Sequence, residues 1–271
     1  TDLWAGHAVG HVLEMEGRVD EGIRWLRGLA AHTGSCNNLR FHVHWHEALF
    51  HLARGDHDAA LDLYDRAVRV EATDDYRDHS NGVTLLWRLE REGVDVGDRW
   101  EELAEIGAAR RNDPSLAFAV VHYGVALVGA GRFADARRLA DDAAPNDGLP
   151  PTTTVPEAGE RTQTRLSREL ARPIVRAFLA FAEGRPGLSV ALLHPLRHRI
   201  QQLGGSHAQR DVFHQFLVDA ALAAGDPAVA RQVLDERAAN RSGPNAFDSD
   251  RRAAILASAT LGPTASIASA G

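Results

Sequence analysis

Two HxxxH pairs near the start of the chain combine a residue type and a spacing that can bind metal. His7 and His11 are four residues apart, Glu14 lies three further on, and His42 and His46 repeat the four-residue spacing. Residues four apart lie on one face of a helix, so each pair can offer two imidazoles to the same point. Imidazole nitrogen is a common ligand of zinc and related ions. The spacing is therefore competent for metal chelation.

These histidines have three alternative interpretations. In the first, four imidazoles, or three together with Glu14, hold a metal such as zinc. In the second, they line a polar groove that recognises a peptide or a small acidic ligand, with tryptophans as aromatic anchors. In the third, they are hydrogen-bonded core residues that only pack the fold. We favour the second, and its predicted groove residues are Trp4, His7, His11, Glu14, His42, Trp45, His46, Trp87, His122, Arg210 and Asp211.

A metal-dependent enzyme is the alternative function from a different class. In it the four histidines of the two HxxxH pairs hold the ion and Glu14 serves as general base. HxxxH is a weak motif on its own, and no GxSxG nucleophile motif occurs, so no catalytic residue is assigned. The chain has no GxGxxG or GxxxxGK loop and no lysine for a Schiff base, so no cofactor is expected.

The run SHAQRD offers a further candidate at the start of a predicted helix. Ser206 can cap this helix, whereas Arg210 and Asp211 are adjacent, so their side chains point in different directions. The favoured interpretation is an N-cap with a structural arginine. In the alternative, the free N–H groups of the helix end and Arg210 hold an anionic group from the groove.

The elements that carry these residues recur with a fixed period. Gly17, Gly55, Gly93 and Gly131 follow one another at intervals of 38 residues, and a similar pattern follows each of them. A period in this range is typical of stacked helical hairpins, which form a solenoid with an extended concave face. The sequence therefore predicts an all-α, right-handed solenoid whose first helices line a shared inner wall.

Small residues and loop-forming segments divide the chain further. Gly22, Ala60 and Ala136 lie five residues after a repeat glycine, where the second helix of a pair must approach its neighbour closely. Clusters of Pro, Gly and Thr mark a loop. The predicted organisation is four helical pairs over 1–144, a linker at 145–166, two further pairs over 167–240, and a C-terminal loop, capping helix and frayed tail over 241–271.

The second unit carries the residues of a known repeat. Its pattern G-D-x-x-x-A-x-x-x-Y-x-x-A, from Gly55 to Ala67, resembles the tetratricopeptide repeat, with about one helical turn more per unit. The runs HAVGHVLEMEGRVDEGIRWL, HxxWHxALFxLxxGDxxAALxxYD and LGGSHAQRDVFHQ resemble the tetratricopeptide repeat protein 38 family over nearly the whole chain. That resemblance implies a helical-repeat fold and adds no defined chemistry.

Charge and composition limit the class of partner. The 271 residues carry a net charge of −7 with no basic block, which argues against nucleic acid and against an anionic membrane surface. No run of about 18 apolar residues predicts a membrane span. The expected partner is a peptide, a protein or a small ligand in the groove.

The single cysteine, Cys36, excludes an intrachain disulfide, and a reducing cytoplasm is the expected compartment. The chain opens without methionine and within a predicted helix, so we expect a fragment or a processed chain whose N-terminal neighbour is absent.

Overall fold

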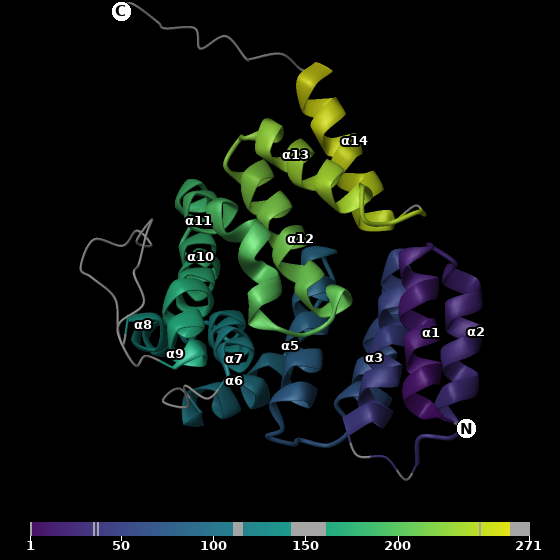
Figure 1. Cartoon of the computed structure of the whole chain (residues 1–271). Helices are drawn as coiled ribbons and strands as arrows, with labels where there is room; N and C mark the ends of the chain where they lie inside the picture. Colours follow the sequence, from purple (N-terminus) through teal and green to yellow (C-terminus); the bar gives the residue numbers. More distant parts are fainter. Residues whose placement is uncertain are drawn as a thin grey trace, which may run out of the picture.

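All regular secondary structure in the described residues is helical, as predicted (Figure 1). The computed structural model describes residues 2–34, 36, 38–110, 116–141, 161–243 and 245–260. The first four units contain α1 (Leu3–Met15) and α2 (Val19–Ala30), α3 (Asn38–Ala53) and α4 (His57–Leu63), α5 (Tyr76–Arg91) and α6 (Arg99–Ala109), and α7 (Ala117–Gly129) and α8 (Phe133–Asp141). One π-helical turn, η1 (Tyr64–Val68), extends α4.

The later units repeat this hairpin arrangement. They contain α9 (Thr162–Leu166), the π-turn η2 (Ser167–Ala171), α10 (Arg172–Ala182), α11 (Pro186–Leu193), the 3-10 helix η3 (His194–Leu203), α12 (His207–Ala223), α13 (Pro227–Ala238) and α14 (Ala246–Thr260). The end of the predicted linker at 145–166 is therefore helical from Thr162 onward, which corrects that boundary. The reason is a tertiary contact, because Leu166 is buried and the Gln163 side chain accepts a hydrogen bond from the Ala117 N–H at the start of α7. Residues 142–160 and 261–271 lie outside the described part of the chain.

The repeat glycines form the turn of each hairpin. Gly17, Gly55, Gly93 and Gly131 have φ angles of 68°, 77°, 82° and 70°, in the left-handed region where a Cβ atom is disfavoured. This conformation ends the first helix and lets the chain reverse into the second. The glycines thus recur every 38 residues because each hairpin turn requires a residue with a positive φ angle.

The first helices of successive pairs stack side by side as a shared wall. α1 packs on α3, α3 on α5, α5 on α7 and α7 on α10. Polar contacts between these helices recur at a separation of 39 residues, as in the pairs His42–Asn81 and Trp45–Thr84. Side chains that are in contact across neighbouring first helices are therefore 39 residues apart in sequence, one more than the 38-residue repeat.

The close approach predicted at Gly22 is present. A Cβ atom at Gly22 would overlap the ring of Phe50 on α3, whereas nothing lies within 4 Å of a Cβ at Gly28 in the same helix. We expect Gly22→Ala to lower the free energy of unfolding by about 1–3 kcal/mol through overpacking. Gly28→Ala should instead raise it by about 0.5–1 kcal/mol, because alanine favours an exposed helix. Urea unfolding of both variants measures the difference, and equal effects would contradict the packing.

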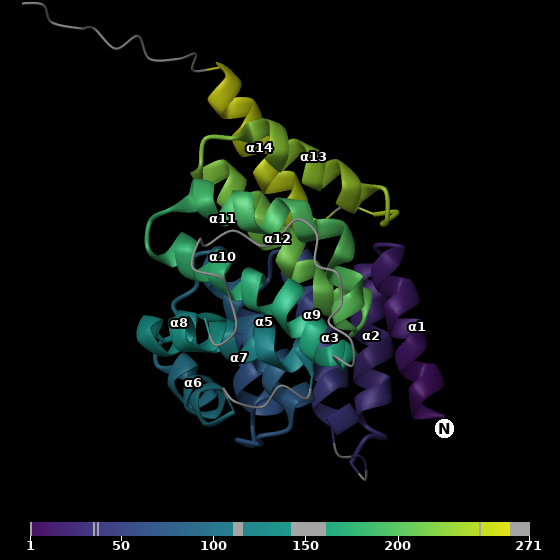
Figure 2. The same ribbon diagram turned by 60° about the vertical axis from the view of Figure 1, so that its left-hand side comes forward.

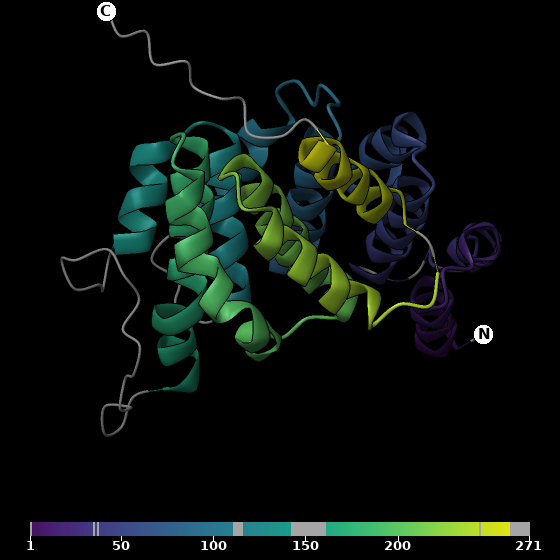
Figure 3. The ribbon, with the colours of Figure 1, turned by 90° about the horizontal axis from the view of Figure 1, so that it is seen from above.

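The C-terminal helices fold back over the inner side of the array. The Arg88 guanidinium on α5 donates to the carbonyl of Ala208 on α12 at 2.9 Å, and the Arg91 Nε donates to Asp219 at 3.1 Å. Figure 2 shows α13 and α14 above α12, and in Figure 3 α14 lies between α13 and α3 and contacts both. The Ser242 N–H also donates to the Met15 carbonyl at the end of α1. Helix α12 thus occupies part of the concave face that the sequence predicts to be open.

No helix in the described part of the chain combines the length and the apolarity that crossing a lipid bilayer requires.

Candidate functional site

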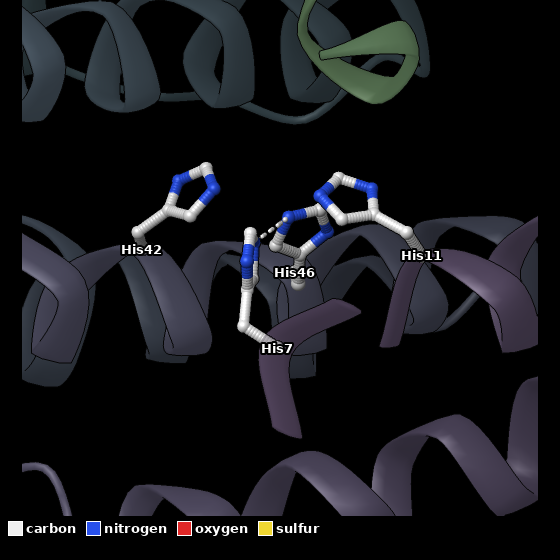
Figure 4. A group of neighbouring side chains, drawn as sticks. All are labelled: His7, His11, His42 and His46. Atoms are coloured by element: carbon white, nitrogen blue, oxygen red, sulfur yellow. Dashed lines mark hydrogen bonds between the residues drawn. The ribbon is translucent and has the colours of Figure 1, made fainter. Parts of the chain in front are cut away.

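Four of the predicted groove histidines converge on one point between α1 and α3 (Figure 4). Helix α1 supplies His7 and His11, and α3 supplies His42 and His46. One ring nitrogen of each lies within 4.8 Å of the others, and the Nε2 atoms of His7 and His46 are 3.1 Å apart. The i,i+4 spacing within each helix and the side-by-side packing of the two helices together produce this cluster.

A second layer of side chains orients two of these rings. The Nδ1 of His42 lies 3.2 Å from Oδ1 of Asn81 on α5, and the ring stacks on Trp45 at 5.2 Å between centroids. The Nδ1 of His46 faces Oε2 of Glu14 at 3.7 Å. Nδ1 of His42 is hydrogen-bonded and Nδ1 of His46 lies near a carboxylate beyond hydrogen-bond distance, so Nε2 of each ring is left for the shared centre.

The cluster consists of neutral imidazoles at neutral pH. Burial, followed by the neighbouring His11, lowers the pKa of His7 to about 4. Burial, followed by the neighbouring His7, lowers the pKa of His42 to about 3, and burial holds the pKa of His46 well below its usual value. The pKa of His11 is also lowered, again mainly by burial. Neutral rings keep a nitrogen lone pair, which a metal ion requires.

Glu14 belongs to a buried charge network behind the histidines. Burial raises its pKa to about 7, against the opposing effect of Arg241, whose Nη2 lies 3.9 Å from Oε1. Burial also lowers the pKa of Arg88 to about 10. Burial alone would raise the pKa of Asp211, but Arg237, Arg241 and Arg88 hold it far below its usual value. Glu14, Arg88, Asp211 and Arg241 share a small void of about 40 Å³.

A larger cavity of about 490 Å³ lies in front of the histidine cluster. Its wall includes three of the four histidines together with residues from α5, α7 and the loop before α12. The lining residues are Trp4, His7, His11, Asn38, Leu39, His42, Tyr76, Arg77, Asn81, Leu116, Phe118, Gln163, Leu203, Gly204, Gly205, Ser206 and Gln209. His46 lies behind this wall, with 1% of its surface exposed.

Three predicted aromatic and histidine residues have other surroundings. Trp45 is fully buried and its Nε1 donates to Thr84, so it supports His42 instead of facing a ligand. Trp87 is buried in the core against Phe178 and Phe216, which corrects its prediction as an anchor. His122 is buried, and its Nδ1 lies 2.6 Å from the Phe118 carbonyl in its own helix. Its place in the groove is corrected in the same way, because the apolar face of α7 turns into the core.

The residues of the SHAQRD run make capping and ion-pair contacts, and they also line cavities: Ser206 and Gln209 that of about 490 Å³, and Arg210 and Asp211 a separate one of about 580 Å³. Ser206 and Gln209 form a reciprocal capping box at the start of α12. Arg210 donates to the carbonyls of Gly204 and Gly205, and Asp211 pairs with Arg237. Arg210 and Asp211 therefore point in different directions, as predicted, and the contacts support the N-cap interpretation.

Sequence reasoning missed Asn81, Arg88 and Arg241. Asn81 could have been found, because it lies 39 residues after His42, at the separation that relates neighbours on the inner wall. Arg88 lies on the same helix, one turn after Thr84, to whose carbonyl it donates. Arg241 gives no such signal, since it reaches Glu14 only because the last helices fold back.

The lowered pKa values of two buried histidines outside the cluster predict that the fold loses stability in acid. Burial lowers the pKa of His79 to about 3 and of His122 to about 4, and Arg69 and Arg88 add to these shifts. The unfolded chain takes up protons near the ordinary histidine pKa while the fold does not, so stability falls as the pH drops through that range. The fall in the free energy of unfolding between about pH 7 and about pH 5 should be about 2 kcal/mol smaller for His79→Gln than for the wild-type chain. Urea unfolding at both pH values measures it, and an unchanged loss would contradict a neutral His79.

The comparison with protein families agrees with the hairpin architecture. The family model described as tetratricopeptide repeat matches residues 42–66 and 117–142. These are α3 with α4, and α7 with α8, which are two of the hairpins described above. The match supports a tetratricopeptide-repeat protein, a class of helical scaffold for protein binding. No solved structure gives a significant match to the chain.

Proposed function

We propose that this chain is a binding scaffold that holds a small ligand, or the end of a peptide, in the cavity in front of its histidines. The observation that supports this is the cavity itself, about 490 Å³ between α1, α3, α5 and the start of α12. This volume is within the range of small-molecule sites, about 300–1,000 Å³.

The chemistry of the lining supports a ligand with one polar end. Imidazole and amide groups of His7, His42 and Asn81 occupy one side, and they can donate or accept hydrogen bonds. Most of the exposed surface of the lining is apolar, from side chains such as Leu39 and Phe118, and Arg77 and Gln209 add further polar groups. A few polar groups in an otherwise apolar wall fix the orientation of a ligand.

The position of α12 limits how a protein partner can bind to the inner face. Tetratricopeptide repeats support a protein-binding role, but α12 covers part of the inner face on which an extended segment would lie. We therefore propose that a protein partner presents a chain end to the cavity. The finer resemblance to the tetratricopeptide repeat protein 38 family belongs to this proposal and names no ligand.

A cavity-filling variant tests the proposal. Short free-acid peptides and small carboxylic acids are screened by thermal shift against the wild-type chain, and the compounds that stabilise it are titrated. Leu116→Trp, which fills the cavity from the start of α7, should weaken their binding by at least about tenfold, about 1.4 kcal/mol. Val70→Trp, at an exposed position outside the cavity, is the control. Equal binding to both variants would place the ligand elsewhere.

A metal-dependent enzyme is the second candidate, favoured by the convergence of the four histidines. Glu14, however, lies behind His46 beside Arg241, and it does not line the cavity. Its position suits orientation of His46 better than contact with a substrate. Turnover of chromogenic esters or phosphoesters that requires zinc and disappears in His11→Ala would support the enzyme, and zinc-independent turnover would argue against it.

A further inference from the structure

We infer that His7, His11, His42 and His46 form a binding site for one divalent transition-metal ion of the zinc class. This inference goes beyond the proposed ligand cavity and stands without it, because it depends only on the four side chains and their surroundings. The ion would lie in the cavity wall, between the first helices of two successive repeats.

The distances suit such an ion after a small closure. Zinc–nitrogen bonds of about 2.0–2.1 Å place tetrahedral ligand nitrogens about 3.3 Å apart. The Nε2 atoms of His7 and His46 are 3.1 Å apart, and all four ligand atoms lie within 4.8 Å of one another. Contraction of the longest separations by about 1.5 Å completes the tetrahedron, which rotation of imidazole rings can supply.

The surroundings point the correct atoms inward. Asn81 faces the Nδ1 of His42 and Glu14 faces the Nδ1 of His46, so the Nε2 of each is left for the centre. In Figure 4 the four rings face a common space between the two helices. A carboxylate or amide oxygen behind a ligating imidazole is the usual second layer of a metal site, because it fixes the tautomer and the ring direction.

Within the described part of the chain, His46 has an unpartnered buried nitrogen, a feature that it shares with the buried His79 and His122 outside the cluster. His46 is buried, yet its Nδ1 has no hydrogen-bond partner among the described residues, since Glu14 lies just beyond hydrogen-bond distance. Its other nitrogen meets a second imidazole nitrogen, that of His7. The observation that points to an ion is therefore the convergence of four imidazoles on one point, two of them in direct contact. A cation at the centre would draw the four lone pairs inward and strengthen the contact with Glu14.

The donor set decides the class of ion. Four nitrogen ligands without a carboxylate in the first layer do not suit calcium or magnesium, which prefer oxygen. Imidazole suits zinc, copper, nickel and iron, and the absence of thiolate leaves a site for a borderline ion. The one cysteine of the chain, Cys36, is not a member of the cluster.

Metal titration of the full chain tests the site. The protein is stripped with a chelator and titrated with zinc in competition with a colorimetric chelator, and separately with cobalt(II), whose visible spectrum reports four-coordinate geometry. We expect one ion per chain and a tetrahedral cobalt spectrum. His46→Ala and His11→Ala should each weaken zinc binding at least about 100-fold, since each removes one of four ligands.

A matched control is available on the same helix. His44 lies between His42 and His46 on α3 but is outside the cluster, so His44→Ala should bind zinc like the wild-type chain. Circular dichroism checks that each variant keeps its helices, and His42→Gln replaces any variant that does not fold. Absence of stoichiometric zinc, or equal binding by His44→Ala and His46→Ala, would overturn the inference. Leu116→Trp should weaken binding of the cavity ligand but bind zinc like the wild-type chain. The ligand proposal and the metal proposal can therefore be contradicted independently of each other.

Discussion

Asp211→Asn should lower the free energy of unfolding by about 3 kcal/mol, the largest stability effect we expect from one near-isosteric change. Arg237 donates to one oxygen of Asp211, and the Gln215 side-chain amide donates to the other at 2.9 Å. Asparagine can accept only one of these bonds, and it removes the negative charge beside Arg237, Arg241 and Arg88. Asp248 remains as a partner of Arg237, which limits the loss.

Chemical denaturation at neutral pH measures this effect. Asp235→Asn is the control, because Asp235 and its partner Arg252 are both exposed. An exposed pair contributes about 0–1 kcal/mol. Equal stabilities of the two variants would contradict a stabilising role of the buried Asp211–Arg237 pair.

Glu14→Gln should weaken zinc binding by about 10–100-fold, the range found when the second layer of a metal site is altered. Glutamine keeps the shape of the side chain but cannot ionise, whereas Glu14, whose pKa burial raises to about 7, carries its negative charge behind His46 Nδ1 above that pH. That charge offsets part of the positive charge of the ion and increases the basicity of the ring. The change should leave the ligand count and the cobalt spectrum unaltered.

Glu16→Gln serves as the matched control for this prediction. Glu16 follows the last residue of α1, is exposed, and pairs with Arg18. Competition titrations with zinc should give the wild-type affinity for Glu16→Gln. A wild-type affinity for Glu14→Gln as well would show that the carboxylate does not act on His46.

The helical array was predictable because every hairpin turn needs a residue with a positive φ angle, and glycine recurs at these positions. Gly17 and its equivalents are the positions that require a positive φ, so they recur wherever a hairpin turns. The convergence of His7 with His46 followed from the same period, since repeats of equal length bring corresponding positions of neighbouring first helices together. Local spacing and a repeat length were sufficient for both.

The contacts made by the last helices could not be predicted in this way. Arg241 reaches Glu14, and Ala208 reaches Arg88, only because α12 and the segment before α14 fold back over the wall. No period relates these residues, which are far apart in sequence. Trp87 was misplaced for a related reason, because stacking of later units buries the side of α5 that carries it.

The position of a bound ion is the sharpest test of the four-histidine site. A crystal of the full chain grown with zinc, with anomalous scattering recorded at the zinc edge, locates the metal without reference to affinity. We predict a single strong peak between α1 and α3, about 2.0–2.1 Å from nitrogens of His7, His11, His42 and His46. A zinc-loaded crystal with no peak there, or with its peaks only at surface carboxylates, would contradict the account.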